Sequence, residues 1–220
     1  MKVKATPLNP HLDNHKLRWR RSESWSEAAK TCFSEGDFDS AVIFYWISLN
    51  SLFAVDNAVT SQDPPTSPAK TERDAFLRRL QEFDKQEGGL YHLMWQQYSQ
   101  TIQPLLNNKF VYGRYWEAIK DGEDDTKWRE AMDASKNSAQ KALTQQGSLE
   151  SLLIIIFDRL NVLRNQLVHG SATKNGSRNR SQVHTGAHLL HTLVPEIQRI
   201  FKQNSTKDWG EPPYKPQEDQ

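Results

Sequence analysis

The sequence predicts an all-α protein. Apolar residues recur every three or four positions in several segments, as between Val42 and Phe53, and this spacing puts them on one face of a helix. No segment keeps the two-residue alternation of apolar and polar side chains that is typical of a half-buried strand. Proline and glycine clusters, such as the three prolines in residues 60–70, separate the periodic segments. These patterns favour a bundle of antiparallel helices with an elaborated middle segment.

Start and stop signals place the helices along the chain. A first helix over 22–36 begins at a serine cap and ends at Gly36, and a second over 38–59 begins at Asp37 or Asp39. Glycine pairs, prolines and polar clusters divide the rest of the chain. The remaining helices are expected over 72–87, 90–106, 124–146, 148–170 and 182–201, and the class of 109–122 stays open.

Composition divides the chain into three regions. Residues 1–21 include the basic stretch HKLRWRR and are expected to be a loosely held arm, either solvated or in contact with phosphate groups. Residues 22–201 hold the helices and are long enough to form one domain with a hydrophobic core. Residues 202–220 contain three prolines and are expected to be a flexible tail.

Composition and charge also limit the class of protein. Apolar residues make up 36% and charged residues 25%, which is typical of a soluble globular domain. The formal net charge of +1 means that any basic surface must be local. The single cysteine, Cys32, excludes an intramolecular disulfide and a cysteine-built zinc site. Because no apolar stretch approaches the roughly 20 residues of a transmembrane helix, and the N-terminus lacks the apolar segment of a signal peptide, we expect a cytoplasmic protein without a membrane partner.

The strongest functional signal is RNQLVHG, residues 164–170, which closes the most apolar helix. One side of that helix is leucine and isoleucine and is expected in the core. The polar stripe on another side consists of Asp158, Asn161, Asn165 and His169. Arg164 and His169 stand about 140° apart around the axis, so one straight helix does not aim both at one phosphate. They converge if the helix loosens at Gly170, or if the same helix of a second subunit lies alongside.

Histidine and arginine without metal ligands suit one reaction. Imidazole moves protons near neutral pH, and guanidinium fits the geometry of phosphate. The motif has no paired carboxylates, no nucleophile beside a base and no glycine-rich phosphate loop. An RNA 2′-hydroxyl would attack its own phosphodiester while His169 moves protons and Arg164 stabilises the phosphate. The structural alternative is that His169 and Gly170 only end a helix and that Arg164 forms a salt bridge.

The pattern R-N-x-L-V-H-G at the end of an apolar helix resembles the R-x4-6-H signature of the HEPN superfamily, the higher eukaryote and prokaryote nucleotide-binding domains. The helical hairpin near the N-terminus and the helix after the motif extend the likeness over most of residues 22–201. The resemblance implies a metal-independent endoribonuclease without a cofactor, often a toxin or a phage-defence effector. It assigns catalytic roles to Arg164, Asn165 and His169 at a site shared across a homodimer.

The resemblance also bears on partners. RNA is the implied substrate, and a neutralising antitoxin or a regulatory protein is a further implied partner. The antitoxin-paired subgroup carries a tyrosine two residues after the histidine, whereas this chain has Ser171, so regulation through that tyrosine is not expected. Superfamily members without nuclease activity supply the alternative, a catalytically silent module that binds a nucleotide or a protein. A monomer with His169 buried and bonded to the backbone would favour this alternative.

A basic loop follows the motif directly. Its cationic side chains are Lys174, Arg178 and Arg180. Beside a phosphate-cleaving site this loop is expected to help hold RNA, with an ordinary solvated loop as the alternative. Removing its charges is not expected to change the stability of the fold, because loop charges contribute little.

Two further groups of side chains have weaker functional interpretations. Three histidines share one face of the last helix and offer a metal site as a weak alternative to ordinary, partly buried histidines: His184, His188 and His191. Four tryptophans are expected in the core and not on a base-stacking surface: Trp46, Trp95, Trp116 and Trp128.

Overall fold

The computed structural model describes residues 10–54, 68–144, 149–171, 173–177 and 180–214, and every element in them is a helix or a helical turn. The all-α prediction is therefore confirmed. In chain order the elements are α1 (Pro10–Ser34), α2 (Phe38–Phe53), α3 (Pro68–Asp84), α4 (Gly89–Gln97), the π-helical turn η1 (Tyr98–Ile102), α5 (Gln103–Asn107), the 3-10 turn η2 (Lys109–Val111), α6 (Gly113–Asp121), α7 (Asp125–Thr144), α8 (Leu149–Val168) and α9 (Arg180–Gln203).

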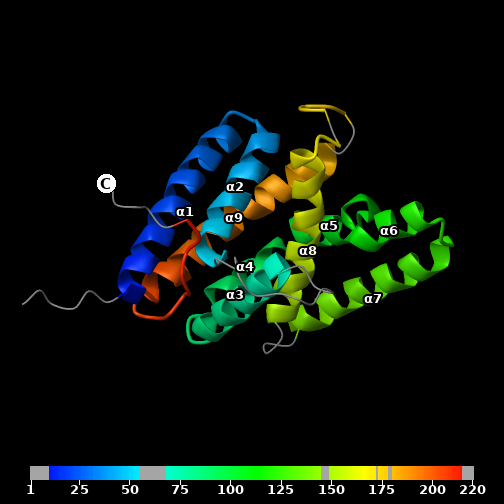
Figure 1. Ribbon diagram of the computed structural model, residues 1–220. Helices are drawn as coiled ribbons and strands as arrows, with labels where there is room; N and C mark the ends of the chain where they lie inside the picture. The colour runs from blue at the N-terminus through cyan, green and yellow to red at the C-terminus, as the bar shows by residue number, and fades with distance from the viewer. Residues whose placement is uncertain (1–9, 55–67, 145–148, 172, 178–179, 215–220) are drawn as a thin grey trace, which may run out of the picture.

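Helix α8 is the centre of the arrangement. The α1–α2 hairpin and α9 lie together on one side of it, and the α6–α7 hairpin extends from the other side (Figure 1). Helix α3 packs beside the N-terminal half of α8. The main hydrophobic core includes α1, α2, α8 and α9, while a small separate cluster of Ala118, Trp128 and Met132 joins α6 to α7. Side chains of α8 are therefore presented to both halves of the molecule.

The apolar side of α8 is buried, as its spacing predicts. The fully buried residues on this side are Leu152, Leu153, Ile156, Leu160 and Leu163. Leu167, one turn further along, is partly buried at the edge of the core. Burial of each such side chain contributes about 1.5–3 kcal/mol. At the C-terminal end the side-chain amide of Gln166 donates a hydrogen bond to the carbonyl oxygen of Phe110 at 2.7 Å, which ties α8 to η2.

The structure differs from the predicted N-terminal arm, because α1 already begins at Pro10. His15 is buried, stacks on Phe201 with ring centroids 4.4 Å apart, and donates from Nε2 to the carbonyl oxygen of Phe201 at 3.0 Å. Arg18, one turn later, is fully buried. The basic stretch that suggested an arm thus forms a packed side of a helix. Residues 1–9 of the predicted arm lie outside the described residues.

The structure also differs from the predicted flexible tail. Trp209 is only 6% exposed and packs against Phe76, Phe83 and Phe201. Its indole N–H donates to the carbonyl oxygen of Asn204 at 2.9 Å, which satisfies the one polar atom of the ring. Proline content suggested a chain with nothing to bury, but this segment buries Trp209 against the core. Residues 215–220 lie outside the described residues.

Arg18 joins the tail to the first two helices. Its guanidinium donates to the carbonyl oxygens of Ala54 at 2.7 Å, Glu211 at 3.0 Å, Ser51 at 3.3 Å and Gly210 at 3.4 Å. Burial lowers the pKa of Arg18 to about 10, so the side chain stays charged at neutral pH. The carbonyl groups at the end of α2 and in the tail therefore obtain their donors from one buried side chain.

Helix boundaries follow the sequence signals in part. Asp37 caps α2, and its side chain accepts a hydrogen bond from the backbone N–H of Ser40 at 3.3 Å, as one of the two predicted caps. Ser22 does not cap a helix, because it lies buried inside α1 with its hydroxyl hydrogen-bonded to Ser48 at 2.9 Å. The helix expected over 90–106 is interrupted by η1, directly before the segment that contains Pro104.

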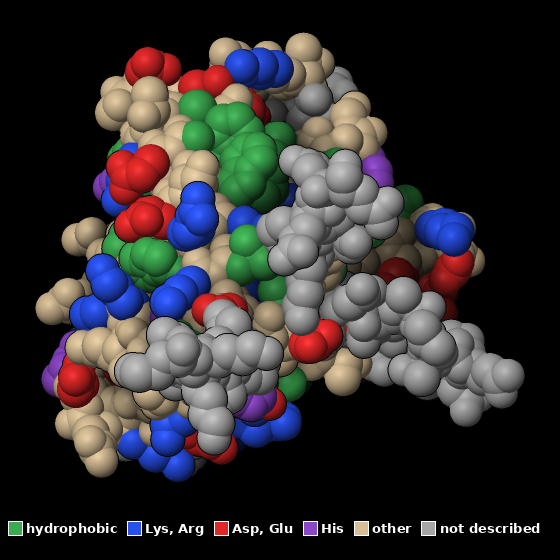
Figure 2. All heavy atoms as spheres, turned by 60° about the vertical axis from the view of Figure 1, so that its left-hand side comes forward, with side chains coloured by type: hydrophobic (Ala, Val, Ile, Leu, Met, Phe, Trp, Pro, Cys, Tyr) green, Lys and Arg blue, Asp and Glu red, His purple; other side chains and the backbone are tan. Residues whose placement is uncertain are grey.

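Charged side chains of both signs are interspersed over the face shown in Figure 2, without one large basic area. This distribution agrees with the net charge of +1. In the described ranges, no helix combines the length and the apolar character that spanning a bilayer requires.

We predict that Arg18→Met destabilises the protein by about 3 kcal/mol or more, because each buried carbonyl left without a donor costs about 1–3 kcal/mol. Urea unfolding followed by circular dichroism measures the change. Arg20→Met is the matched control, since Arg20 is an exposed arginine of the same helix. Equal stability of the two variants would contradict the structural role of Arg18.

Candidate functional site

Two recesses flank the polar stripe of α8. The first, which we call the arginine recess, is a cavity of about 760 Å³, and its basic lining residues are Lys70, Arg73, Arg114, Arg159 and Arg164. The second, which we call the His169 recess, is a more open groove of about 1310 Å³ that includes Phe110, Trp116 and His169. Four residues line both: Gly113, Glu117, Val162 and Asn165. The recesses are therefore neighbours, with Asn165 of the motif at their boundary.

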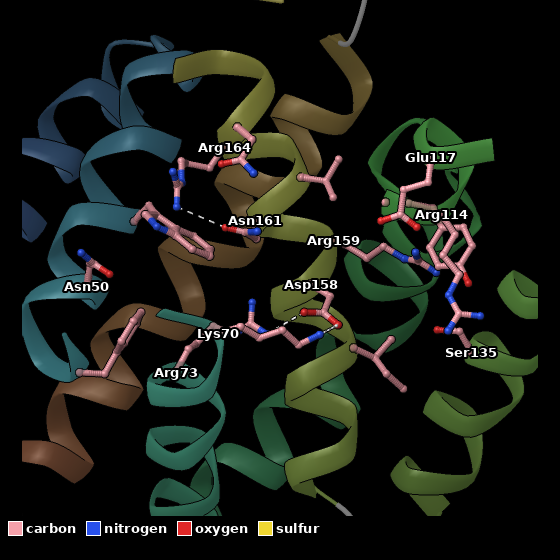
Figure 3. Close-up of a pocket in the computed structure, with 17 residues that line it drawn as sticks. Asn50, Lys70, Arg73, Arg114, Glu117, Ser135, Asp158, Arg159, Asn161 and Arg164 are labelled. Carbon is pink, nitrogen blue, oxygen red and sulfur yellow. Dashed lines mark hydrogen bonds and ion pairs between the residues drawn. The ribbon is translucent and has the colours of Figure 1, made fainter. Parts of the chain in front are cut away.

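Arg164 enters the arginine recess on the side of α2. Its guanidinium lies over the ring of Trp46, 5.1 Å from the ring centroid, and Nη2 donates to Oδ1 of Asn161 at 3.2 Å (Figure 3). Its Nε is buried without a hydrogen-bond partner, and burial lowers the pKa of the group. No carboxylate of the described residues pairs with Arg164. The salt bridge expected of a purely structural arginine is thus not formed within the described part of the chain.

His169 lies just beyond the C-terminal end of α8 and is exposed. Its backbone N–H still bonds to the carbonyl oxygen of Asn165 at 2.9 Å, and the left-handed conformation of Gly170, with φ +67°, ends the helix. The imidazole makes no hydrogen bond or ion pair with any described residue. A buried His169 bonded to the backbone, the arrangement expected of a silent module, is not what the structure has.

Arg164 and His169 do not converge within one chain. Arg164 opens into the arginine recess and His169 into the other one. The helix does not loosen before Gly170, because the helical hydrogen bond of His169 is intact. The first route to convergence that the sequence allows, a loosened helix end, is therefore not seen in this conformation, and the second route, a second subunit, stays a prediction. Chemically, each recess offers one half of an acid–base and phosphate-binding pair.

The basic loop after the motif is bound to the start of α2. Nη1 and Nη2 of Arg180 donate to the two carboxylate oxygens of Asp39, each at 2.7 Å, and Nζ of Lys174 lies 2.9 Å from Oδ2 of Asp37. Asp39 is 5% exposed and also accepts the backbone N–H of Asn175 at 3.1 Å. Arg178 lies outside the described residues. The geometry gives Arg180 a structural partner, and RNA binding by this loop stays a prediction.

The three late histidines face aromatic rings and do not surround a common point. Nε2 of His184 and Nε2 of His188 are hydrogen-bonded at 3.1 Å, whereas His191 stacks on Phe33 and bonds through Nδ1 to the hydroxyl of Tyr45 at 2.7 Å. Burial lowers the pKa of His188 and of His191, which favours their neutral forms. Among the described residues, no group of three histidine, cysteine or acidic side chains is placed to hold a metal ion.

Sequence reasoning missed Arg159. It is 2% exposed, and it leaves α8 on the side opposite Arg164, toward α6 (Figure 3). The signal was present, because Arg159 is seven residues after Leu152 and four before Leu163 and therefore lies on the buried side of the helix. Its guanidinium lies 3.9 Å from the ring centroid of Tyr112.

The expected burial of four tryptophans holds for only two of them. Trp46 and Trp128 are in the core, but Trp95 is 55% exposed and Trp116 is 41% exposed. Trp116 donates its indole N–H to the carbonyl oxygen of Phe110 at 2.8 Å, and Phe110 is itself 40% exposed. These two aromatic faces belong to the His169 recess, where they are available to a ligand.

No known family model, curated protein or solved structure shows significant similarity to this chain.

We predict that Arg180→Gln lowers the free energy of unfolding at pH 7 by about 1–3 kcal/mol, because it leaves the buried Asp39 without its main partner. This reverses the expectation that charges of this loop do not affect stability. Thermal unfolding measures it, and Lys174→Gln is the control with little change, because Lys174 forms only an exposed pair.

The same pair predicts a pH dependence. Burial alone would raise the pKa of Asp39, but the hydrogen bonds from Arg180 and Asn175 outweigh it and lower the pKa below its usual value. A lowered folded-state pKa gives stability that is present above the ordinary aspartate range and is lost as the pH falls through the folded-state pKa. The difference between wild type and Arg180→Gln should therefore shrink under acid. A difference that stays constant from pH 7 to about pH 3 would contradict this origin.

Proposed function

We propose that this chain is a metal-independent endoribonuclease in which His169 and Arg164 act on a phosphodiester at a cleft shared by two copies of α8. The observation that carries the proposal is the state of the two side chains. His169 is exposed and unpaired among the described residues, and Arg164 has a buried Nε without a partner and no ion pair. Buried polar groups of structural residues are ordinarily hydrogen-bonded, so the unpartnered Nε of Arg164 supports a role toward a ligand, and the exposed imidazole of His169 is accessible to one.

The reaction needs no nucleophile from the protein. The 2′-oxygen of the RNA forms a bond to phosphorus as the bond to the 5′-oxygen breaks, which leaves a 2′,3′-cyclic phosphate and a 5′-hydroxyl. One imidazole removes the proton of the 2′-hydroxyl, and a second protonates the departing 5′-oxygen. With His169 of the partner subunit as the second imidazole, both steps have a group. Arg164 stabilises the added negative charge on the phosphate, and Asn165 orients the phosphate between the recesses.

The surroundings of His169 support RNA as the substrate class. Trp116 and Phe110 present partly exposed rings in the same recess, and unpaired bases stack on such rings in single-stranded RNA recognition. The resemblance of RNQLVHG to the HEPN motif also supports this proposal. A single cysteine is compatible with the reducing cytoplasm, where such an enzyme would act. In a toxin or defence role, the enzyme would also require a neutralising or regulatory partner.

A second candidate function is a catalytically silent module that binds a nucleotide or a protein. The observation that favours it is the position of Arg164, which is half-buried over Trp46 and turned away from the His169 recess. Removal of the His169 imidazole distinguishes the two functions. It should abolish RNA cleavage by an endoribonuclease, and it should leave ligand binding by a silent module intact.

We predict that His169→Ala and Arg164→Ala each lower the rate of RNA cleavage by at least about a hundredfold, the usual scale for loss of an acid–base or charge-stabilising group. Cleavage of a fluorescently labelled single-stranded RNA measures the rate. His184→Ala is the matched control, because His184 is an exposed histidine that does not line either recess. Equal loss in the control, or full activity of His169→Ala, would refute the assignment.

We also predict that EDTA leaves the rate unchanged, since imidazole and guanidinium perform the reaction without a metal ion. Activity that disappears with EDTA and returns with zinc or manganese would contradict the proposal and point to the late histidines. The control is a metal-dependent nuclease treated in parallel.

The shared cleft predicts a dimer at micromolar concentration. Val168, beside His169, is 52% exposed and offers an apolar contact at the end of α8, so Val168→Asp should give a folded monomer with little activity. Sedimentation velocity measures the mass.

A tagged heterodimer of wild-type and His169→Ala chains tests whether the site is composite. A composite site should leave the heterodimer with far less than half of the wild-type activity. Retention of half the activity would mean that each subunit carries a complete site.

A further inference from the structure

The arginine recess contains a buried guanidinium that the proposed cleavage reaction does not use. Arg159 is 2% exposed, and its Nε and Nη2 are buried without a hydrogen-bond partner among the described residues. Burial lowers its pKa to about 10, so it stays charged at neutral pH. Burying this charge is unfavourable, and the ring of Tyr112 at 3.9 Å and the charge of the adjacent Asp158 offset only part of that cost, because the effect of burial on the pKa outweighs theirs.

The neighbouring carboxylates do not satisfy Arg159. Asp158 precedes it in sequence, but its two oxygens are bound by Arg73 at 2.6 Å and Lys70 at 3.2 Å (Figure 3). Glu117, the other acidic lining residue, is exposed and makes no ion pair with Arg159 among the described residues. Five basic and two acidic side chains line the recess, so its formal charge is positive by three.

The N-terminus of α6 opens into the same place. Gly113 and Arg114, its first two residues, both line the recess. The cap residue Tyr112 gives no side-chain hydrogen bond to the helix, and the first turn contains no acidic residue. The backbone N–H groups of Gly113 and Arg114, which precede the first intrahelical hydrogen bonds, and the positive end of the helix dipole thus lie at the recess, whereas the N–H of Tyr115 bonds to the carbonyl oxygen of Tyr112. Arg114 adds a cation at a position where a cation opposes the dipole, which is unfavourable unless an anion is bound.

We propose that the Arg159 end of the arginine recess is a binding site for a terminal phosphate group. A guanidinium fork together with helix amides matches the several oxygens of a phosphate monoester, and Ser135 of α7 adds a hydroxyl to the lining (Figure 3). The volume of about 760 Å³ is larger than phosphate alone and suits a small phosphorylated molecule such as a sugar phosphate. The site lies at the opposite end of the recess from Arg164, and this proposal does not depend on cleavage at His169.

Isothermal titration calorimetry with the full chain tests the site, using inorganic phosphate and ribose 5-phosphate as probes. Arg159→Lys keeps the charge and loses the fork, and should weaken binding at least about tenfold. Arg129→Lys, which replaces another arginine over an aromatic ring but outside the recess, should change binding less than about twofold. Added phosphate should raise the Tm of wild type more than that of Arg159→Lys.

Arg114→Glu keeps the test decisive if substitutions at the buried Arg159 prevent folding. Arg114 is exposed, and a glutamate in the first turn favours the helix dipole, so the unliganded variant should be at least as stable as wild type. Phosphate binding should nevertheless fall at least about tenfold. No binding by wild type up to about 10 mM phosphate, or binding unchanged in both Arg159→Lys and Arg114→Glu, would overturn the proposal.

Two further titrations distinguish a small phosphorylated metabolite from the phosphorylated end of an RNA as the ligand. Ribose 5-phosphate that binds more tightly than a 5′-phosphorylated oligoribonucleotide supports a small metabolite as ligand. Tighter binding of the 5′-phosphorylated oligonucleotide than of its 5′-hydroxyl counterpart, lost in Arg114→Glu, assigns the site to an RNA end. Equal binding of the two oligonucleotides, with no binding of ribose 5-phosphate, would contradict a phosphate-monoester site.

Discussion

The burial of α8 between the two halves of the molecule is the constraint on which the candidate sites depend. Each fully buried leucine or isoleucine of its core side contributes about 1.5–3 kcal/mol, and five of them are fully buried. That total exceeds the several kcal/mol that one unpaired guanidinium costs. The helix therefore stays folded in place while it holds Arg159 and Arg164 in positions where their nitrogen atoms lack partners. A less buried helix would turn these side chains to solvent and lose both recesses.

The geometry of one helix also explains why the candidate sites are divided. Five residues separate Arg159 from Arg164 and Arg164 from His169, and each interval turns the side chain by about 140°. Successive functional groups consequently point toward α6, toward α2 and into the His169 recess. Within one chain, Arg159 and Arg164 line different ends of one cavity. In the proposed reaction, a second copy of α8 would bring an arginine and a histidine to one phosphate.

Local periodicity predicted what depends on neighbours along the chain. The core side of α8, the polar stripe from Asp158 to His169 and the Asp37 cap follow from spacing of three, four or seven residues. Interactions between distant segments were not predictable in this way. Arg18 bonds Glu211, and Arg180 bonds Asp39, across 193 and 141 residues, so two basic side chains that were expected at the surface, in an arm and in a loop, take part in contacts between distant segments. Arg159 combines both situations. Its spacing from Leu152 and Leu163 predicts that it lies on the buried side of α8, but nothing in the sequence predicts that two of its nitrogen atoms lack hydrogen-bond partners there.

The chemistry of the cut ends tests the central claim most directly, that His169 and Arg164 act on RNA through the substrate's own 2′-hydroxyl. The purified protein is incubated with a defined single-stranded RNA, and the products are analysed by mass spectrometry. The account predicts a 2′,3′-cyclic phosphate or 3′-phosphate on one fragment and a 5′-hydroxyl on the other, with no cutting where the ribose lacks its 2′-hydroxyl. Fragments that carry a 5′-phosphate and a 3′-hydroxyl, or equal cutting of an all-DNA strand, would contradict it.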